Sequence, residues 1–352
     1  MSSINKILII RFSSMGDIIL ASPFIRVLRH LNPQARIDFL VKSEYAELIK
    51  YNHHLSSVIE LTSLEDGELK EIKQTIRDEK YDVIFDLHNS LRSRYLRTFS
   101  GARHVAVVDK RVFARFVLVK FKWNIYRDIV SVADRYLEAG KSFGVQNDGK
   151  GLEIFIPADI QNNVAGVMSK FKLDRYEIVI GIVPTARHKT KQWLQDRFVE
   201  LGVKLSKEKK AKVFIFGGKE EAEYCGDIAQ MINANLEANV AENFAGQFSL
   251  LETAASFDFY DLVVSNDTGL MHLAAARHKK VVAIFGSTVQ EFGFYPYGTK
   301  SIVVERKGLS CRPCSHIGLD TCPQGHFRCM KDISVDDVLF AVRKIITDEK
   351  RQ

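Results

Sequence analysis

A membrane-spanning helix needs about 18–20 consecutive apolar residues, and no apolar run in the sequence approaches that length. The apolar part of its opening stretch, MSSINKILIIRF, is also too short for a secretory signal. Low-complexity tracts and short-period repeats are absent as well. We therefore expect a globular protein of the cytoplasm rather than a membrane-spanning or secreted one.

Cysteine is sparse, with five in 352 residues. Thiols in the cytoplasm stay reduced, and structural disulfides are rare there. The cysteines therefore favour free thiols or a metal site over disulfide cross-links.

Two nucleotide-binding motifs are also missing. No GxGxxG follows any expected strand, and GxxxxGK[ST] does not occur. These absences disfavour the usual dinucleotide site of dehydrogenases and a P-loop kinase.

The composition that is present, 46% hydrophobic and 26% charged, is ordinary for a globular protein. Because the chain is longer than the roughly 100–200 residues of one domain, we expect two domains. Lys and Arg outnumber Asp and Glu by 50 to 43, a formal net charge of +7. This mild excess gives some support for an acidic partner such as a phosphate, a nucleic acid or an anionic membrane.

Short apolar runs without alternation recur along the chain and are typical of strands buried on both faces of a parallel sheet. We expect strands at residues 6–12, 35–41, 57–61 and 81–88 in the first half, and at 176–184, 211–218, 259–267 and 280–287 in the second. Residues 152–160 are also strand-like. Helical patterns lie between the strands, and a last amphipathic helix is expected over residues 335–350.

The predicted fold class is therefore α/β, with two doubly wound halves that face each other across a central cleft. We expect an N-terminal domain of residues 1–165 and a C-terminal domain of residues 166–352. The C-terminal helix could pack back on the first domain. Ligands of such folds bind beyond the carboxyl ends of the strands.

The stretch RFSSMGDIIL, residues 11–20, leaves the first strand through two serines and a glycine. Gly16 allows a substrate to approach the backbone closely. Asp17 stands where the next helix begins, so its carboxylate can satisfy helix-terminal amides or take part in chemistry. The residues alone leave both roles open. Pro23 predicts that a helix restarts there with Ser22 as its cap.

The stretch SNDTGLMHLAAA, residues 265–276, follows another expected strand and opens a helix. Free amides at the start of this helix would form an anion site, to which Thr268 adds a hydroxyl. His272 lies in the second turn, where a histidine is either packed in the core or beside a bound phosphate.

Two further turns follow strands of the second half. PTARHKTKQW, residues 184–193, is cationic, and Lys191 could neutralise a diphosphate. FGGKEEAE, residues 216–223, places Glu220 and Glu221 after two glycines, where a carboxylate could meet ribose hydroxyls. Surface lysines and helix-start glutamates are also common without any specific function.

Taken together, these stretches resemble the family 9 glycosyltransferases, the ADP-heptose:lipopolysaccharide heptosyltransferase family. ILIIRFSSMGDIILASPFIRVLRHLNP is similar to the opening strand, turn and helix of the family, and FDLHNSLRS (85–93) to its acceptor segment. KQW (191–193), GQFSLLE (246–252) and SNDTGLMHLAAA match in order and spacing. The resemblance covers essentially the whole chain, although Pro184-Thr185 stands where many relatives have Pro-Gly.

The resemblance implies a GT-B fold, two Rossmann-like domains with the active site between them. It implies an inverting transfer of heptose from ADP-heptose to the inner core of lipopolysaccharide, with no cofactor needed for catalysis. Asp17 would be the general base that removes the proton of the acceptor hydroxyl. The residues implied for donor binding are Lys191, Glu221, Phe248, Asp267, Thr268, Gly269 and His272. Those for acceptor binding are Ser14, Met15, Gly16, His88, Asn89, Arg92 and Arg94. The alternatives are a related transferase that uses another nucleotide sugar and, from a different class, a basic nucleic-acid-binding protein.

Aromatic and basic residues interleave over KRVFARFVLVKFKWNIYR, residues 110–127. Such a pattern suits a helix or loop on an anionic lipid surface. Single-strand nucleic-acid binders use a similar mixture, and a half-buried helix with solvated charges would also give it. Because the family acts on a phosphorylated glycolipid, we expect peripheral contact with the inner membrane and no nucleic-acid partner.

The run CRPCSHIGLDTCPQGHFRC, residues 311–329, holds four of the five cysteines. Its C-x2-C-x7-C-x6-C spacing is typical of a structural zinc or iron site. The ligands would be Cys311, Cys314, Cys322 and Cys329. Packed free thiols are the alternative, and disulfides would need an oxidising environment.

Overall fold

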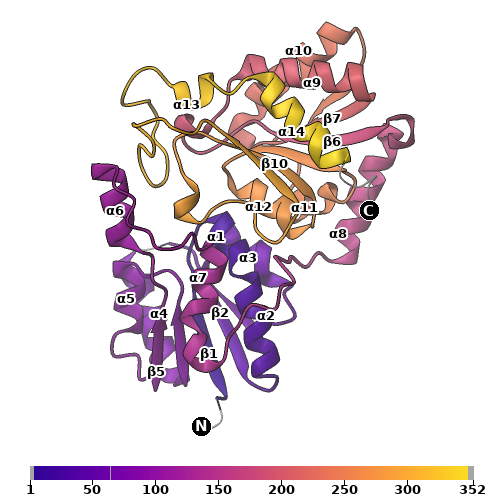
Figure 1. The fold of residues 1–352 in the computed structure, drawn as a ribbon. Coiled ribbons are helices and arrows are strands. Elements are labelled where there is room, and N and C mark those ends of the chain that lie inside the picture. The colour runs from indigo at the N-terminus through magenta and orange to yellow at the C-terminus, as the bar shows by residue number, and fades with distance from the viewer. Residues whose placement is uncertain (1–3, 64, 348–352) are drawn as a thin grey trace. The chain divides into compact units, whose positions relative to one another are not determined.

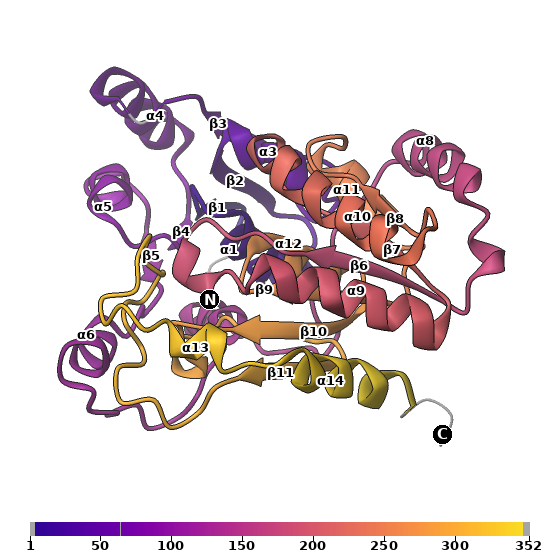
Figure 2. The same ribbon diagram turned by 90° about the horizontal axis from the view of Figure 1, so that it is seen from above.

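The computed structural model describes residues 4–63 and 65–347, which form two compact units. The first unit comprises the residues up to Val112 together with Val130–Phe155. The second comprises Phe113–Ile129 and the residues from Ile156 onward. Figure 1 shows the ribbon coloured along the chain, and Figure 2 shows it turned by 90°.

Each unit is built on one parallel β-sheet. The strand order is β3-β2-β1-β4-β5 in the first sheet and β11-β10-β9-β6-β7-β8 in the second. The first sheet consists of β1 (Lys6–Ile10), β2 (Arg36–Lys42), β3 (Ser57–Leu61), β4 (Val83–Asp86) and β5 (His104–Val107). The second consists of β6 (Ile178–Val183), β7 (Ala211–Ile215), β8 (Ala241–Asn243), β9 (Leu262–Asn266), β10 (Lys280–Phe285) and β11 (Ser301–Glu305). The predicted α/β class with two doubly wound sheets is confirmed.

Every expected strand overlaps an observed one except the strand-like run at residues 152–160. That prediction was wrong, because residues 152–157 form no strand and a helix begins at Ala158. The strands that the sequence did not predict are β5, β8 and β11, which lie at sheet edges. β5 and β11 have no fully buried residue, so their sequences lack the continuous apolar run of a central strand.

Helices cover both faces of the first sheet. They are α1 (Met15–Leu20), α2 (Ser22–Leu31), α3 (Ser43–Lys50), α4 (Asp66–Glu79), α5 (Leu91–Arg97) and α7 (Val132–Ala139). Leu69 of α4 and Leu96 of α5 share one core cluster with Leu8 of β1. On the other face, the rings of Phe24 of α2 and Phe85 of β4 lie 5.0 Å apart.

The start of α2 differs from the prediction. Ala21 is the N-cap, and Ser22 is the first helical residue. The Ser22 hydroxyl donates to the Ile19 carbonyl at 2.7 Å, so it serves the end of the preceding helix instead.

The second sheet is also covered on both faces. The helices of this unit are α6 (Val112–Phe121), which begins at the unit boundary, α8 (Ala158–Met168), α9 (Gln195–Lys209), α10 (Ala222–Leu236), α11 (Leu250–Phe257), α12 (Gly269–Ala276), α13 (Arg328–Lys331) and α14 (Val335–Thr347). Residues of α9, α10 and α14 form one core cluster with β6 and β7 (Figure 2). Phe257 of α11 packs on Phe216 from the other face, with ring centroids 5.2 Å apart.

The last predicted helix is α14, which packs against α9, β10 and β11 of its own unit. Residues 348–350 of that prediction lie outside the described residues. Short 3-10 helices occur at Lys141–Phe143, Ser169–Phe171, Leu173–Arg175, Lys189–Lys191, Lys219–Glu221 and Gln290–Phe292. Among the residues that the structure describes, no helix is both long and apolar enough to cross a membrane.

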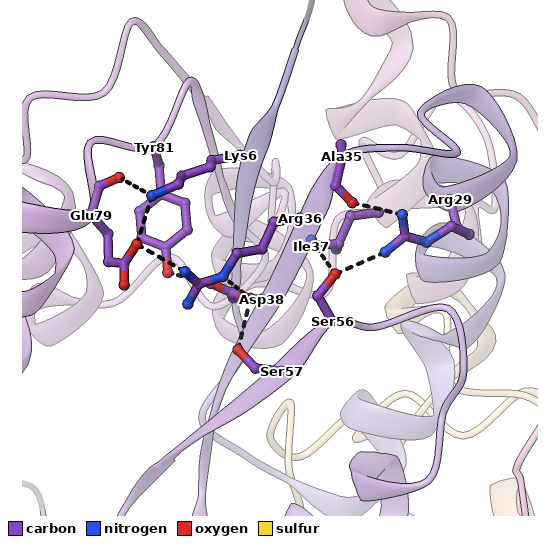
Figure 3. A network of polar contacts seen from close by, with 10 residues as sticks. All are labelled: Lys6, Arg29, Ala35, Arg36, Ile37, Asp38, Ser56, Ser57, Glu79 and Tyr81. Atoms are coloured by element: carbon purple, nitrogen blue, oxygen red, sulfur yellow. Dashed lines mark hydrogen bonds and ion pairs between the residues drawn. The ribbon is translucent and has the colours of Figure 1, made fainter.

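A polar network closes the amino-terminal edge of the first sheet (Figure 3). The carboxylate of Asp38, fully buried on β2, accepts hydrogen bonds from the hydroxyls of Tyr81 and Ser57, both at 2.7 Å. Arg36 pairs with Asp38 at 2.9 Å and with Glu79 at 3.0 Å. Both carboxylate oxygens of Asp38 are thereby engaged within the fold, so this network is structural.

A second buried network joins α2 to the end of the first unit. The guanidinium of Arg26 contacts Asp148 at 2.7 Å and Glu153 at 2.8 Å, and it lowers the pKa of Asp148 to about 2. His54 lies 3.4 Å from Glu153. Burial, followed by the charges of His53 and other nearby cations, lowers the pKa of His54 to about 4. His54 is therefore neutral in the folded protein at neutral pH.

This predicts acid-sensitive stability. A histidine with an ordinary pKa of about 6.5 when unfolded and about 4 when folded takes up a proton more readily in the unfolded chain. Its contribution to stability is present above about pH 6.5 and is lost as the pH falls towards 4. We expect the loss of Tm between pH 7.5 and 5 to be smaller in His54→Gln than in the wild type. The exposed His104→Gln serves as the matched control. An equal loss in all three proteins would contradict the prediction.

Candidate functional site

Asp17 occupies the turn between β1 and α1, at the carboxyl edge of the first sheet. Ser14 is the N-cap of α1, and both its backbone N–H and its hydroxyl donate to Asp17 Oδ2, at 3.2 and 2.9 Å. The carboxylate therefore has the capping role that the sequence allowed. Capping uses only one of the two carboxylate oxygens.

The other oxygen of Asp17 is held by two residues that the sequence did not single out. Arg11 Nη2 lies 2.7 Å from Oδ1, and the Tyr136 hydroxyl of α7 donates to Oδ1 at 3.2 Å. Burial by itself would raise the pKa of Asp17, but the charge of Arg11 and the hydrogen bonds from Ser14 outweigh it. The pKa of Asp17 is therefore lowered, and the side chain is a carboxylate at neutral pH.

The turn after β4 lies beside the turn after β1. Arg11 Nη1 donates to the Leu87 carbonyl at 2.7 Å, and the ring of His88 lies 4.5 Å from that of Phe12. Burial and the charge of Arg11 lower the pKa of His88 to about 3, so its imidazole is neutral. The structure thus gathers Ser14, Asp17 and His88 from the predicted set at one edge.

The remaining acceptor candidates lie on the same turns and on the helix that follows. The amides of His88 and Asn89 donate to the buried Asp86 at 3.0 and 2.7 Å, which fixes the backbone of this turn. Arg92 and Arg94 are exposed on α5. Met15 and Gly16 form the first turn of α1.

Lys191 lies beside the start of α12 in the second unit. Its ammonium is 2.8 Å from Asp267 Oδ2, and the Thr288 hydroxyl donates to the same oxygen at 2.7 Å. Asp267 immediately precedes Thr268, the N-cap of α12, whose side chain makes no capping bond. Amides of the first turn, from Gly269 onward, and the Lys191 ammonium thus belong to one cationic region.

The loop that carries Lys191 is fixed to β9. The side chain of Asn266, fully buried, donates to the Pro184 carbonyl at 2.7 Å and accepts from the Trp193 amide at 3.1 Å. Thr185 is buried next to Pro184, in the place where a glycine was expected from the resemblance. His272, on the second turn of α12, is also buried.

Glu221 and Phe248 belong to adjoining turns of the second unit. The Gly246 amide donates to the Gly217 carbonyl at 3.1 Å, which joins the turn after β7 to the loop before α11. A Cβ at Gly246, whose φ is +69°, would lie 2.7 Å from Lys219 Cα, so this close approach requires glycine. Glu221 Oε2 accepts a hydrogen bond from the Gly218 amide at 2.7 Å. The ring of Phe248 packs on that of Phe244, with ring centroids 4.9 Å apart.

The cysteine-rich run lies against the loop of Lys191. The Thr190 amide donates to the Leu319 carbonyl at 3.0 Å, and the Leu319 amide donates back to the Thr190 hydroxyl at 2.8 Å. Cys311 Sγ is 3.7 Å from His326 Nε2. In residues 4–63 and 65–347, no group of three or more His, Cys, Asp and Glu side chains is arranged to hold a metal ion. As they lie, the four thiols do not fit a tetrahedral metal site.

The residues that the sequence missed are therefore Arg11, Tyr136 and Thr288. Arg11 could have been found from the sequence, because a charged residue directly after the apolar run ILII lies at the carboxyl edge of the sheet. Tyr136 lies 119 positions from Asp17, and no local pattern links the two.

Comparison with known proteins places the chain in a family. A model described as glycosyltransferase family 9 (heptosyltransferase) matches residues 69–322. Over 362 aligned residues, the chain is 26% identical to lipopolysaccharide heptosyltransferase 2 of Salmonella typhimurium, with coverage of 98% of this chain and 99% of the relative.

Two solved structures share the fold. The family 9 glycosyl transferase of Veillonella parvula matches with a TM-score of 0.78 at 21% identity, over 98% of this chain and 97% of that one. The E. coli ADP-heptose LPS heptosyltransferase II matches with a TM-score of 0.73 at 22% identity, over 98% and 99%. The predicted GT-B class, with two Rossmann-like domains, is confirmed.

Proposed function

The chain belongs to glycosyltransferase family 9, and we propose that it transfers heptose from ADP-heptose to the inner core of lipopolysaccharide. The observation that carries the proposal is the start of α12, where Lys191 pairs with Asp267, the residue that precedes the N-cap. Such a region suits a diphosphate, because both the ammonium and the helix terminus attract negative charge. The names of the heptosyltransferase relatives support the choice of sugar.

In the proposed reaction, the acceptor hydroxyl attacks the anomeric carbon of the donor. A carbon–oxygen bond to the acceptor forms, the bond to the ADP phosphate breaks, and the configuration inverts. Asp17 accepts the hydroxyl proton, and ADP leaves with the bonding electron pair. Lys191 and the amides around Thr268 and Gly269 stabilise the charge that grows on the diphosphate.

The other donor candidates have supporting positions. Asp267 would position Lys191 and Thr288 rather than touch the diphosphate, because a carboxylate repels phosphate. Glu221 would meet the ribose with the oxygen that Gly218 leaves free, and Phe248, on the adjoining turn, would contact the adenine. The buried His272 would line the sugar-phosphate pocket from α12.

We propose a division of labour between the units. The second unit would bind the nucleotide sugar, and the first would bind the acceptor through Ser14, Met15, Gly16, His88, Asn89, Arg92 and Arg94. Exposed arginines suit the phosphorylated core of a glycolipid. With such an acceptor, the enzyme would work at the cytoplasmic face of the inner membrane as a peripheral protein.

Replacing Lys191 tests the donor site. We expect Lys191→Ala to raise the Kd for ADP by about 10–100-fold, because a hydrogen bond to a charged group contributes roughly 1.5–3 kcal/mol. The measurement is calorimetric titration with ADP, ADP-heptose and UDP-N-acetylglucosamine. The exposed Lys189→Ala, from the same turn, is the control and should change the Kd by less than about threefold. Preference for the UDP sugar would replace ADP-heptose by another donor, and binding of none would refute a nucleotide-sugar site.

Replacing Asp17 tests the general base. We expect Asp17→Asn to lower kcat by about 10²–10⁴, the usual contribution of a general base, with little change in the Kd for ADP-heptose. Asp337→Asn is the matched control, because Ser334 donates to Asp337 as Ser14 does to Asp17. If Asp17 only caps its helix, the two variants will retain similar activity. Asp17→Asn leaves the buried Arg11 without its ion-pair partner, which could destabilise the fold. The Tm of both variants is therefore measured to confirm that they are folded.

We also propose a structural zinc or iron ion at Cys311, Cys314, Cys322 and Cys329. The support is the C-x2-C-x7-C-x6-C spacing alone. Because the described side chains are not arranged around a metal, an ion would have to draw the four thiols together. Burial and the neighbouring Cys314 and Cys322 raise the pKa of Cys329 to about 12, and a metal would favour the thiolate instead. We expect elemental analysis to find one equivalent of metal, and Cys322→Ser to lose it. Metal-free protein with four titratable thiols would establish packed free cysteines.

A further inference from the structure

Four aromatic side chains of the second unit form an exposed surface on α6 and just beyond it. We call Phe113, Phe116, Phe121 and Trp123 the aromatic surface. Their relative exposures are 72%, 55%, 52% and 69%. Proteins seldom leave such a contiguous apolar patch in water, and a patch of this kind usually marks an interaction site.

The arrangement of these rings follows from the helix. Val117 and Leu118 form the buried side of α6. Phe113, Phe116 and Lys120 follow each other at spacings of three and four residues and therefore share one face, which is exposed. The ring centroid of Phe121 lies 6.0 Å from that of Phe116 and 5.9 Å from that of Trp123, so these three rings form a continuous cluster.

The cluster is presented on a fixed support. The Lys122 ammonium donates to the Pro313 carbonyl, and Asn124 donates to Glu291 at 2.8 Å. Figures 1 and 2 both show α6 beside the loop that precedes α13. The segment is therefore attached at its carboxyl end to the body of its unit, and the exposure is not that of a frayed terminus.

The charge around the cluster is positive. Residues 113–129 contain four basic residues and one acid: Arg115, Lys120, Lys122, Arg127 and Asp128. Aromatic rings flanked by cations complement the surface of an anionic bilayer. The cations can pair with the phosphate headgroups, and the rings can enter the apolar region below them. A second copy of this chain would offer an equally cationic patch, which would repel the first.

We infer that the aromatic surface inserts into the headgroup region of an anionic membrane and holds the enzyme there. The inference rests on the proposed function in one respect only, since a glycolipid acceptor explains why the enzyme needs a membrane. Trp and Phe rings are amphipathic or apolar anchors at that depth, and each nearby cation strengthens binding by about fivefold. The partner is the lipid surface itself.

The test is co-sedimentation of the full chain with vesicles of phosphatidylethanolamine and phosphatidylglycerol. We expect the wild type to sediment with these vesicles and not with phosphatidylcholine vesicles. The triple variant Phe113→Ser, Phe116→Ser, Trp123→Ser should bind at least tenfold more weakly. Phe340→Ser is the matched control, because Phe340 is an exposed phenylalanine on α14 of the same unit.

A second pair of variants tests the electrostatic part. Lys120→Glu replaces an attractive charge by a repulsive one and should weaken binding more at low than at high salt. Lys207→Glu makes the same change on the exposed side of α9 and should have little effect.

The outcomes separate this inference from the proposed function. The inference of a membrane-binding surface would be overturned if the wild type did not bind anionic vesicles. It would also be overturned if the triple variant bound them as well as the wild type does. Two other results would also overturn it: a wild-type dimer that is lost in the triple variant, and salt-sensitive binding of the wild type to single-stranded nucleic acid instead of vesicles. ADP-heptose binding and transfer to a deacylated, water-soluble acceptor should remain unchanged in the triple variant. If those activities are absent from the wild type, the proposed function fails, whatever the vesicles show.

Discussion

Parallel pairing of the strands is the constraint on which the candidate site depends. Because all strands of a sheet run in one direction, every turn that follows a strand leaves from the same edge. In the first unit, the turn after β1 with Asp17 therefore adjoins the turn after β4 with His88. In the second, the turn after β6 adjoins the turn after β9. Hydrogen bonds of 2.7 Å from Arg11 to Leu87 and from Asn266 to Pro184 then lock each pair of turns together.

Both units hold a buried carboxylate against a cation at this edge, but the roles of the two pairs differ. Desolvation of a buried ion pair can cost as much as its attraction returns, so neither pair is explained by stability alone. Arg11 keeps Asp17 ionised although burial opposes it, which suits a carboxylate that must accept a proton. Asp267 holds Lys191 beside Thr268, which suits a cation that must meet an anion. Under the proposed function, Arg11 positions the reactive carboxylate of Asp17 in the first unit. In the second unit, Asp267 positions the ligand-binding ammonium of Lys191.

The sequence predicts those features that depend on neighbouring residues. Apolar runs located the central strands, and the serines and the glycine after the first apolar run located the first turn. Edge strands such as β5 and β11 escaped because half-exposed strands lack that run. The contact between Tyr136 and Asp17 escaped for another reason, since it joins positions far apart in the chain and depends on how α7 packs. The roles of the site residues follow from the resemblance and from chemistry, and they stay predictions.

Thr190 links two features that appear separate in the sequence, the loop that carries Lys191 and the cysteine-rich run. Its hydroxyl accepts from the Leu319 amide and from the Ser287 hydroxyl, at 2.8 and 3.0 Å, and it immediately precedes Lys191. The loop that carries Lys191 is thus supported by Asn266 on one side and by the cysteine-rich run on the other. A displacement of residues 311–322 would break the bonds to Thr190 and move the ammonium of Lys191. Under the proposed function, the state of the cysteines would therefore affect donor binding, even though no thiol needs to touch the nucleotide.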